Sequence, residues 1–161
     1  MADIFTDNSA VRNESGVQNN ENISDEIDVD PCVDAANAEV FQAVSNRYTT
    51  PLSNTAAYEG SMADMYLRKL ATQLGSCYLM KALYEGQGGD LMESVEDKCK
   101  TVRERLTMVA GGTVKLYLDD GSELDIRDSG LKTPTGFPTN SSLYNTEDPT
   151  DIPYFSTQDV F

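Results

Sequence analysis

The chain has 161 residues, of which 27 are acidic and 12 are basic, so its formal net charge at pH 7 is −15. A chain of this length forms one domain with a single core, and the acid excess argues against a groove that grips nucleic acid, which needs clustered Lys and Arg. The sequence has no apolar run of transmembrane length and no basic-then-apolar start like that of a signal peptide, so we expect no membrane partner and folding in a reducing cytosol.

The charge is unevenly distributed along the chain. Residues 1–47 carry 10 acidic and 2 basic side chains, residues 48–112 carry 8 and 7, and residues 113–161 carry 9 and 3, which gives −8, −1 and −6 and sums to −15. We therefore expect a nearly neutral helical core at residues 30–112 with the acidic residues concentrated on either side of it.

Residues 1–29 are predicted to form an acidic N-terminal arm with a short helix from Thr6 to near Gly16. Its few apolar residues, Ile4, Phe5, Val11 and Val17, are candidates for pinning the arm to a larger body. The acidic run at residues 24–30 suggests calcium, but the Gly and the bidentate Glu of a calcium loop are missing at the required positions, so we expect a solvated lead-in to a helix and neither metal nor cofactor.

The first long helix is predicted to begin at Asp30-Pro31, because Asp is a good N-cap and Pro is favoured at the first helical position. It should end near Tyr48, since Pro51 excludes Thr50 from the helical region. Its short apolar face consists of Val33, Asn37, Val40, Phe41 and Val44.

A central helix is predicted from Tyr58 to Tyr84, and its apolar residues cover more than one stripe, so it needs neighbours on two sides. Gly75 within it either lets another helix approach closely or is a tolerated defect. The first stripe is Met62, Tyr66, Leu70, Leu74, Cys77 and Leu83, and the second is Ala63, Leu67, Ala71 and Tyr78.

A third helix should follow the turn at residues 86–89, with Asp90 and Glu93 as a capping box and Gly111-Gly112 at its end. Its opposite face alternates in charge, which is typical of a solvated face and, in a ring of copies, would also suit contact with a neighbour. The apolar stripe is Met92, Val95, Cys99, Val102, Leu106 and Val109.

Residues 113–128 alternate between apolar and polar residues around Asp119-Asp120-Gly121-Ser122, which predicts a β-hairpin. Turn chemistry explains its carboxylates, so we do not interpret them as a catalytic cluster. Residues 129–161 are rich in Pro, Thr, Ser and Asn and should form an extended C-terminal arm. The fold class is therefore mainly α: a small helical bundle with a β-hairpin and long extended N- and C-terminal arms.

Nothing in the sequence indicates an enzyme. It contains no His, nucleophile elbow, phosphate loop or metal-ligand spacing. Cys32, Cys77 and Cys99 are odd in number and fall in predicted helices, so we expect buried thiols that behave as small hydrophobes.

Two sequence elements resemble a known family of structural proteins. These are Arg47-Tyr48-Thr49-Thr50-Pro51-Leu52 after the first helix and Ala110-Gly111-Gly112-Thr113-Val114-Lys115-Leu116 after the third. Together with the helices between them, over residues 30–118, they resemble the head-tail adaptors of tailed bacteriophages, also called head-completion or connector proteins, of the phage Mu type.

The resemblance implies a virion protein of the neck, assembled in the bacterial host cytoplasm, that forms a ring, commonly twelvefold, beneath the portal. It implies contacts with the portal protein, with further copies of itself and with the next neck or tail protein, while packaged DNA passes through without specific binding. Arg47, Tyr48, Pro51, Leu52, Gly111 and Gly112 are then fold-motif residues, and Asp119, Asp120 and Glu123 of the hairpin face the channel or the next ring. The arm residues expected to bind the portal or a neighbour are Phe137, Tyr144, Tyr154, Phe155 and Phe161.

Two alternatives stay open from the sequence. One is a soluble helical protein-binding adaptor with disordered acidic arms that forms no ring. The other is a different neck or tail-completion component, although such proteins are expected to be mostly β, unlike this chain.

Overall fold

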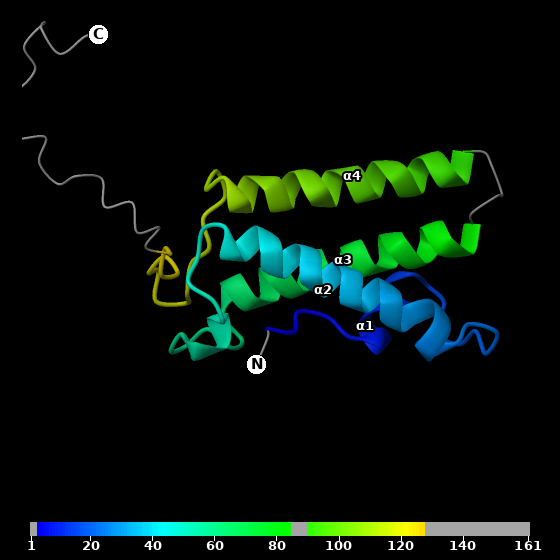
Figure 1. Cartoon of the computed structure of the whole chain (residues 1–161), viewed down its shortest axis with the longest axis horizontal. Coiled ribbons are helices and arrows are strands. Elements are labelled where there is room, and N and C mark those ends of the chain that lie inside the picture. Colours follow the sequence, from blue (N-terminus) through cyan, green and yellow to red (C-terminus); the bar gives the residue numbers. More distant parts are fainter. Residues whose placement is uncertain (1–2, 85–89, 128–161) are drawn as a thin grey trace, which may run out of the picture. The chain divides into compact units, whose positions relative to one another are not determined.

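The computed structural model describes residues 3–84 and 90–127 of the chain. Within these residues the protein is mainly helical, as predicted, with α1 at Asn8–Glu14, α2 at Asp30–Ser45, α3 at Met62–Tyr84 and α4 at Asp90–Ala110 (Figure 1). The predicted turn at residues 86–89 and the predicted C-terminal arm at 129–161 lie outside the described residues. Among the described residues, no helix combines the length and the apolarity that crossing a bilayer requires.

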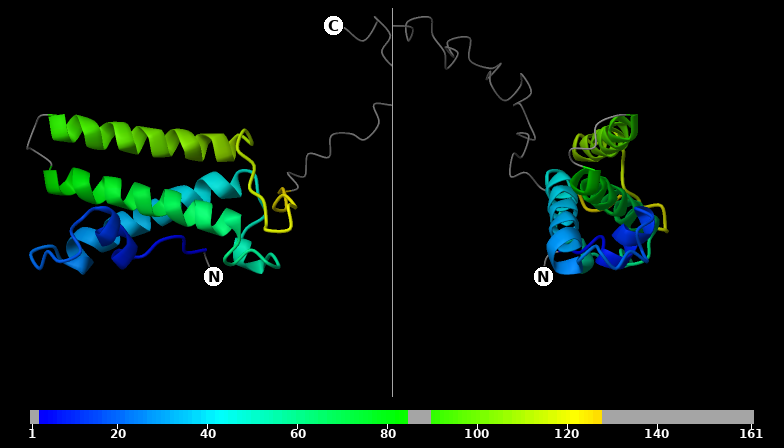
Figure 2. Two further views of the ribbon diagram at one scale, coloured as in Figure 1. Left: turned by 180° about the vertical axis from the view of Figure 1, so that it is seen from behind. Right: turned by 90° about the vertical axis from the view of Figure 1, so that its right-hand side faces the viewer.

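Three long helices form the body of the fold. α2 crosses α3 on one side, and α4 lies antiparallel beside α3 (Figures 1 and 2). The core is formed by the apolar faces of these helices, and the predicted neighbours on two sides of the central helix are therefore confirmed. Its largest members from α2 and α3 are Val40, Val44, Leu67, Leu70 and Leu74, and those from α4 are Val102, Leu106 and Val109.

Two residues of the central helix differ from the prediction. The helix begins at Met62, so Tyr58 precedes it in a turn, where its side chain is buried. The Met62 side chain is 66% exposed, although Ala63 and Asp64 in the same turn are buried. Met62 thus lies on the uncovered side of the first turn, which the apolar period alone does not show.

The N-terminal segment is not an extended arm, which corrects the prediction for residues 1–29 over the part described. Phe5, Val11, Ile23 and Val29 are all buried against the helical body. The predicted short helix does form, as α1, with the Asp7 carboxylate accepting the Ala10 N–H at its start. The few apolar residues of the segment are spaced so that most of them reach α2 and α3, and this outweighs its polar composition.

Backbone hydrogen bonds fasten the start of this segment. The Asn37 side-chain oxygen on α2 accepts the N–H groups of Phe5 and Thr6 at 2.9 and 3.0 Å. The buried Asp3 carboxylate accepts the N–H groups of Leu52 and Ser53 at 2.6 and 3.1 Å. The segment before α1 is thus paired with residues on two distant parts of the chain.

Gly75 lets α1 approach α3 closely. A Cβ atom at Gly75 would lie 2.7 Å from Val11 Cγ2, a separation that packed side chains do not adopt. Of the two interpretations left open by the sequence, close approach is therefore confirmed.

The helical region of α2 begins earlier than predicted. Residues Asp25–Val29 form one π-helical turn that runs directly into α2, so Asp30 is not the N-cap. The helical region instead starts at Ser24. The Asp28 carboxylate, one turn into the helix, accepts the Ser24 N–H at 2.8 Å and so caps this start. Pro31 does lie in the first turn of α2, as predicted.

The predicted β-hairpin at 113–128 is wrong as a pair of strands: no β-strand forms within residues 3–84 and 90–127. Residues 113–127 make a tight antiparallel turn with one isolated bridge, Tyr117 to Glu123, and Gly121 at a φ of 82°. The ladder stops because the Leu116 N–H donates to the Tyr48 hydroxyl, and because the Asp125 carbonyl accepts the Thr49 N–H. The Leu116 N–H and the Asp125 carbonyl thus attach this segment to the end of α2.

Candidate functional site

The two sequence elements that suggested a family meet at the end of α2. We call this cluster the Arg47 junction: Arg47, Tyr48, Gly112, Lys115, Leu116 and Glu123. The Arg47 guanidinium donates to a Glu123 carboxylate oxygen at 2.8 Å, and Lys115 Nζ lies 3.2 Å from the other oxygen. Gly112, just past the end of α4, has a φ of 75°, and a Cβ there would lie 2.0 Å from Arg47 Nη1. The positive φ favours glycine at this position, and any added Cβ would push the guanidinium end of the Arg47 side chain off Gly112.

Tyr48 supplies the buried part of the Arg47 junction. Its side chain is fully buried, and its hydroxyl accepts the Leu116 N–H at 3.0 Å. On either side of it, the Thr49 N–H donates to the Asp125 carbonyl at 2.8 Å, and the Arg127 N–H donates to the Arg47 carbonyl at 2.7 Å. The junction thus joins the end of α2 to the segment that follows α4.

The electrostatics of the junction are those of a structural ion pair. The hydrogen bond from Arg47 lowers the pKa of Glu123 below its ordinary value of 4.5, with Lys115 adding to the effect. The same hydrogen bond raises the pKa of Arg47. Glu123 is therefore ionised at neutral pH and is engaged by two cations.

The other predicted fold-motif residues lie beside the junction. Leu52 is buried, in a short 3₁₀ turn at Leu52–Asn54, and it follows Pro51, whose peptide bond with Thr50 is cis. The Gly111 N–H donates to the Thr107 carbonyl at the end of α4. The sequence placed these residues at a helix end and a turn, but it did not indicate that Arg47 lies over Gly112.

The three predicted channel or next-ring residues have different surroundings. Asp119 and Asp120 are exposed at the tip of the turn, whereas Glu123 is turned inward into the Arg47 junction. The Asp119 carboxylate also accepts the Met62 N–H at 3.0 Å, so it caps the start of α3. Hydrogen bonds from Ser122 lower the pKa of Asp120.

The five aromatic residues expected to anchor the protein on a portal or a neighbour lie outside the described residues. They are Phe137, Tyr144, Tyr154, Phe155 and Phe161.

A groove of about 720 Å³ lies between α3 and α4 and reaches the end of α1; we call it the α3–α4 groove. Buried side chains of Cys77, Val95 and Val102 contribute to its lining, and burial raises the pKa of Cys77 to about 12. Such a thiol is protonated and unreactive at neutral pH, as expected for a cysteine that serves as a small hydrophobe. The sequence did not reveal this groove, because its width depends on how far apart α3 and α4 lie. Its remaining lining residues are Glu14, Ser15, Gln73, Ser76, Met80, Glu93, Ser94, Asp97, Lys98, Thr101 and Arg105.

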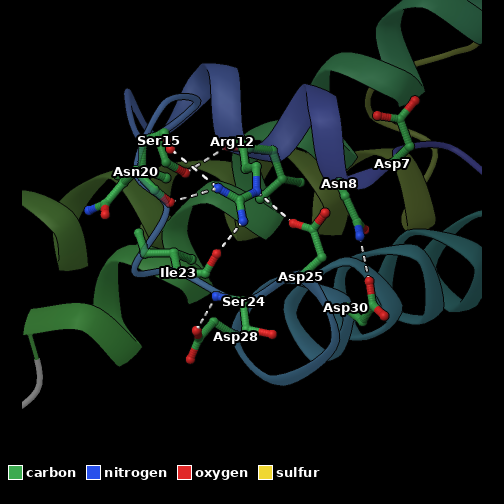
Figure 3. A network of polar contacts seen from close by, with 12 residues as sticks. Asp7, Asn8, Arg12, Ser15, Asn20, Ile23, Ser24, Asp25, Asp28 and Asp30 are labelled. Atoms are coloured by element: carbon green, nitrogen blue, oxygen red, sulfur yellow. Dashed lines mark hydrogen bonds and ion pairs between the residues drawn. The ribbon is translucent and has the colours of Figure 1, made fainter.

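The acidic run at residues 24–30 is used to hold α1 in place (Figure 3). Asp25 lies 2.6 Å from the Arg12 Nε, and the Asp30 carboxylate accepts a hydrogen bond from the Asn8 side chain. Arg12 also donates to the backbone carbonyls of Asn20 and Ile23. These partners account for the run without a metal, and in the described part of the chain no group of acidic, Cys or His side chains is arranged to hold one.

Comparisons with protein-family models, with curated proteins and with solved structures find no match to this chain. The features that bear on its function are therefore the Arg47 junction, the α3–α4 groove and the charges on its surface.

Proposed function

We propose that this protein is a head-tail adaptor of a tailed bacteriophage. In this role it is a structural virion protein of the neck that forms a ring beneath the portal, joins the DNA-filled capsid to the tail and leaves a conduit for DNA. The observation that carries the proposal is the Arg47 junction. Arg47 and Gly112, one from each sequence element of the resemblance, are 65 residues apart in the chain, and the two elements meet in one contact. This one contact therefore explains why both elements occur in the same chain.

The proposed mechanism is assembly, without a chemical step. The charges on α4 are of both signs, so copies can pack side by side without the repulsion that a uniformly acidic body would suffer. Asp119 and Asp120, exposed at the turn, are the carboxylates we assign to the channel or to the next ring, since such groups do not hold passing DNA. Glu123 is engaged in the Arg47 junction and serves to hold the turn in place.

In this proposal the arm at residues 129–161 binds the portal through its aromatic residues. Each aromatic anchor buries a large apolar area, and ordering the arm costs conformational entropy that the anchors must offset. Binding is then strong only on an assembled portal ring, where many arms act together. Tyr154, Phe155 and Phe161 are the anchors we assign first.

The test uses purified protein mixed with portal-bearing, DNA-filled heads stripped of their tail parts. We expect stoichiometric retention of the protein on the heads, and loss of most of this retention in the variant Phe155→Ala/Phe161→Ala. Met65→Ala is the matched control, because it removes an exposed apolar side chain from α3. No retention of the unmodified protein would refute the adaptor function, and full retention of the double variant would refute the anchoring role of the arm.

A second candidate function is that of a helical protein-binding module that forms no ring. The α3–α4 groove favours it, since its volume of about 720 Å³ falls in the range of ligand-binding clefts. The same mixture with filled heads separates the two functions, because a module of this kind would not stay on the heads.

A further inference from the structure

The outward face of α4 carries four charges arranged about Thr101. Asp97, Lys98, Glu104 and Arg105 are all exposed. Within residues 3–84 and 90–127 none of the four takes part in an ion pair, whereas Glu96 and Arg103 on the same helix are paired with Lys81 and Glu39. These four charges are therefore available to a partner.

Helix geometry sorts the four charges by sign. Asp97 and Glu104 are four residues before and three residues after Thr101, which places both on one side of it. Lys98 and Arg105 are three before and four after, which places both on the other side. The face thus has an acidic edge and a basic edge, with Thr101 between them.

This face of α4 borders the α3–α4 groove. Lys98 and Arg105 of the basic edge line it, together with Asp97 of the acidic edge and the small side chains of Ser94 and Thr101. A neighbouring helix can approach the groove at this side without meeting a large side chain from the middle of the α4 face. The apolar lining below supplies surface that such a neighbour would cover.

We propose that this face is the contact between copies of the protein, with the acidic edge of one α4 docked on the basic edge and groove of the next. The charges also select the orientation. Antiparallel pairing about a two-fold axis would bring Lys98 against Arg105 and Asp97 against Glu104, which repel each other. Parallel helices place opposite charges together at both positions.

Parallel helices that face each other squarely would close into a pair about a two-fold axis along the helices. When the helices are offset so that each copy uses one edge toward one neighbour, the contact joins two different surfaces, and each copy can bind one neighbour on each side. Repeated contacts close into a ring when the rotation between copies permits it. The partner of the α4 face is then a second copy of the protein. That the copies form a closed ring rests on the proposed adaptor function.

The test is the mass of the full-length protein by light scattering across a range of concentrations and salt. The unmodified protein is expected to exceed the mass of one chain at high concentration, and to do so less at high salt. Arg105→Glu should raise the dissociation constant at least about tenfold, which is the effect of losing roughly 1.4 kcal/mol. Adding Glu104→Arg to that variant should return the constant to within about threefold of the original, because both edges are then reversed at the same position.

Lys69→Glu is the matched control, since it reverses an exposed charge on α3 away from the groove and should leave the mass unchanged. A protein that stays monomeric throughout, or an Arg105→Glu variant not restored by Glu104→Arg, would overturn the proposed contact. Retention on filled heads is measured separately. Heads that retain a protein lacking this contact would refute the α4 interface and leave the adaptor function standing.

Discussion

Two arginines fasten irregular segments to the helical bundle, one at each end of α2. Arg12 lies where α2 begins and donates mainly to backbone carbonyls, with Asp25 as its ionic partner (Figure 3). Arg47 lies where α2 ends and is held between Gly112 and the Glu123 carboxylate. The Asp25 side chain is 54% exposed and the Glu123 side chain 19%. The Arg12 and Arg47 side chains are exposed to a similar extent, 16% and 21%, so the two sites differ in their partners: Asp25 is open to water, whereas Gly112 and Glu123 hold the Arg47 guanidinium by shape as well as charge.

The sharpest way to break the Arg47 junction is Gly112→Ala. The added Cβ would displace the guanidinium from its place, and the positive φ adds backbone strain, so we expect a loss of about 3 kcal/mol in the free energy of unfolding. Urea unfolding followed by circular dichroism measures it. Gly121→Ala is the control, because its φ is also positive but nothing lies near its Cβ, and its loss should be about 1 kcal/mol. Equal losses for the two variants would show that the Arg47 contact contributes nothing.

Tyr48→Phe tests the buried half of the same junction. It removes the hydroxyl that accepts the Leu116 N–H and leaves that donor without its partner, so we expect a loss of about 2 kcal/mol in the free energy of unfolding. Amide hydrogen exchange should show faster exchange at Leu116. Tyr117→Phe changes a tyrosine that is 44% exposed and is expected to be neutral. Unchanged protection at Leu116 in the Tyr48 variant would contradict the assigned role of the hydroxyl.

Arg12→Met sharpens the comparison at the other end of α2. The substitution keeps apolar bulk but removes all the donors, and we expect a smaller loss, about 1 kcal/mol, since the Asp25 side chain and the hydrogen bond to the Asn20 carbonyl are exposed to water. Exchange of amides in residues 15–24 should quicken while the core amides of α3 change little. A loss as large as that of Gly112→Ala would mean that the two arginines are equivalent.

The smallest expected effect is the pH dependence of the Glu123 pairing. Because the folded-state pKa of Glu123 is lowered below the ordinary 4.5, its stabilising contribution is complete above that value. The contribution is lost as the pH falls through the folded-state pKa. Urea midpoints measured from about pH 6 down to about pH 3 should therefore fall less for Glu123→Gln than for the unmodified protein. Parallel curves for the two proteins would rule out the pairing as a source of acid sensitivity.

The same comparison shows what the sequence can predict. The family resemblance identifies Arg47, Tyr48 and Gly112 as fold-motif residues, because they belong to the two elements that carry it, at a helix end beside a proline turn and in a glycine cap. Arg12 was not identified, since its acceptors are backbone carbonyls and these carry no residue-specific signal. The predicted hairpin failed for a related reason: alternation indicates a ladder, but it does not show that the Tyr48 hydroxyl takes the Leu116 N–H.

The packing of residues 3–29 was predicted in part. Phe5 and Val11 were candidates for pinning this segment to a larger body and are buried, whereas Ile4 is exposed, and the polar composition of the segment wrongly favoured an extended arm. Composition averages over a segment, whereas packing depends on where single side chains fall. The α3–α4 groove was missed for the converse reason, since the stripe on α4 indicates which residues are buried and not how close the next helix lies.

The fit of α1 against Gly75 has a consequence for the order in which the chain folds. A helix of seven residues is unstable alone in water, so α1 gains its conformation only when α3 is there to receive Val11. During synthesis the N-terminal residues leave the ribosome first but wait for residues 72–76, to which Thr6 and Ser15 are hydrogen bonded. The earliest part of the chain therefore cannot reach its final packing until residues 72–76 have been made, and until then the small-residue surface of α3 around Gly75 has nothing from α1 to cover it.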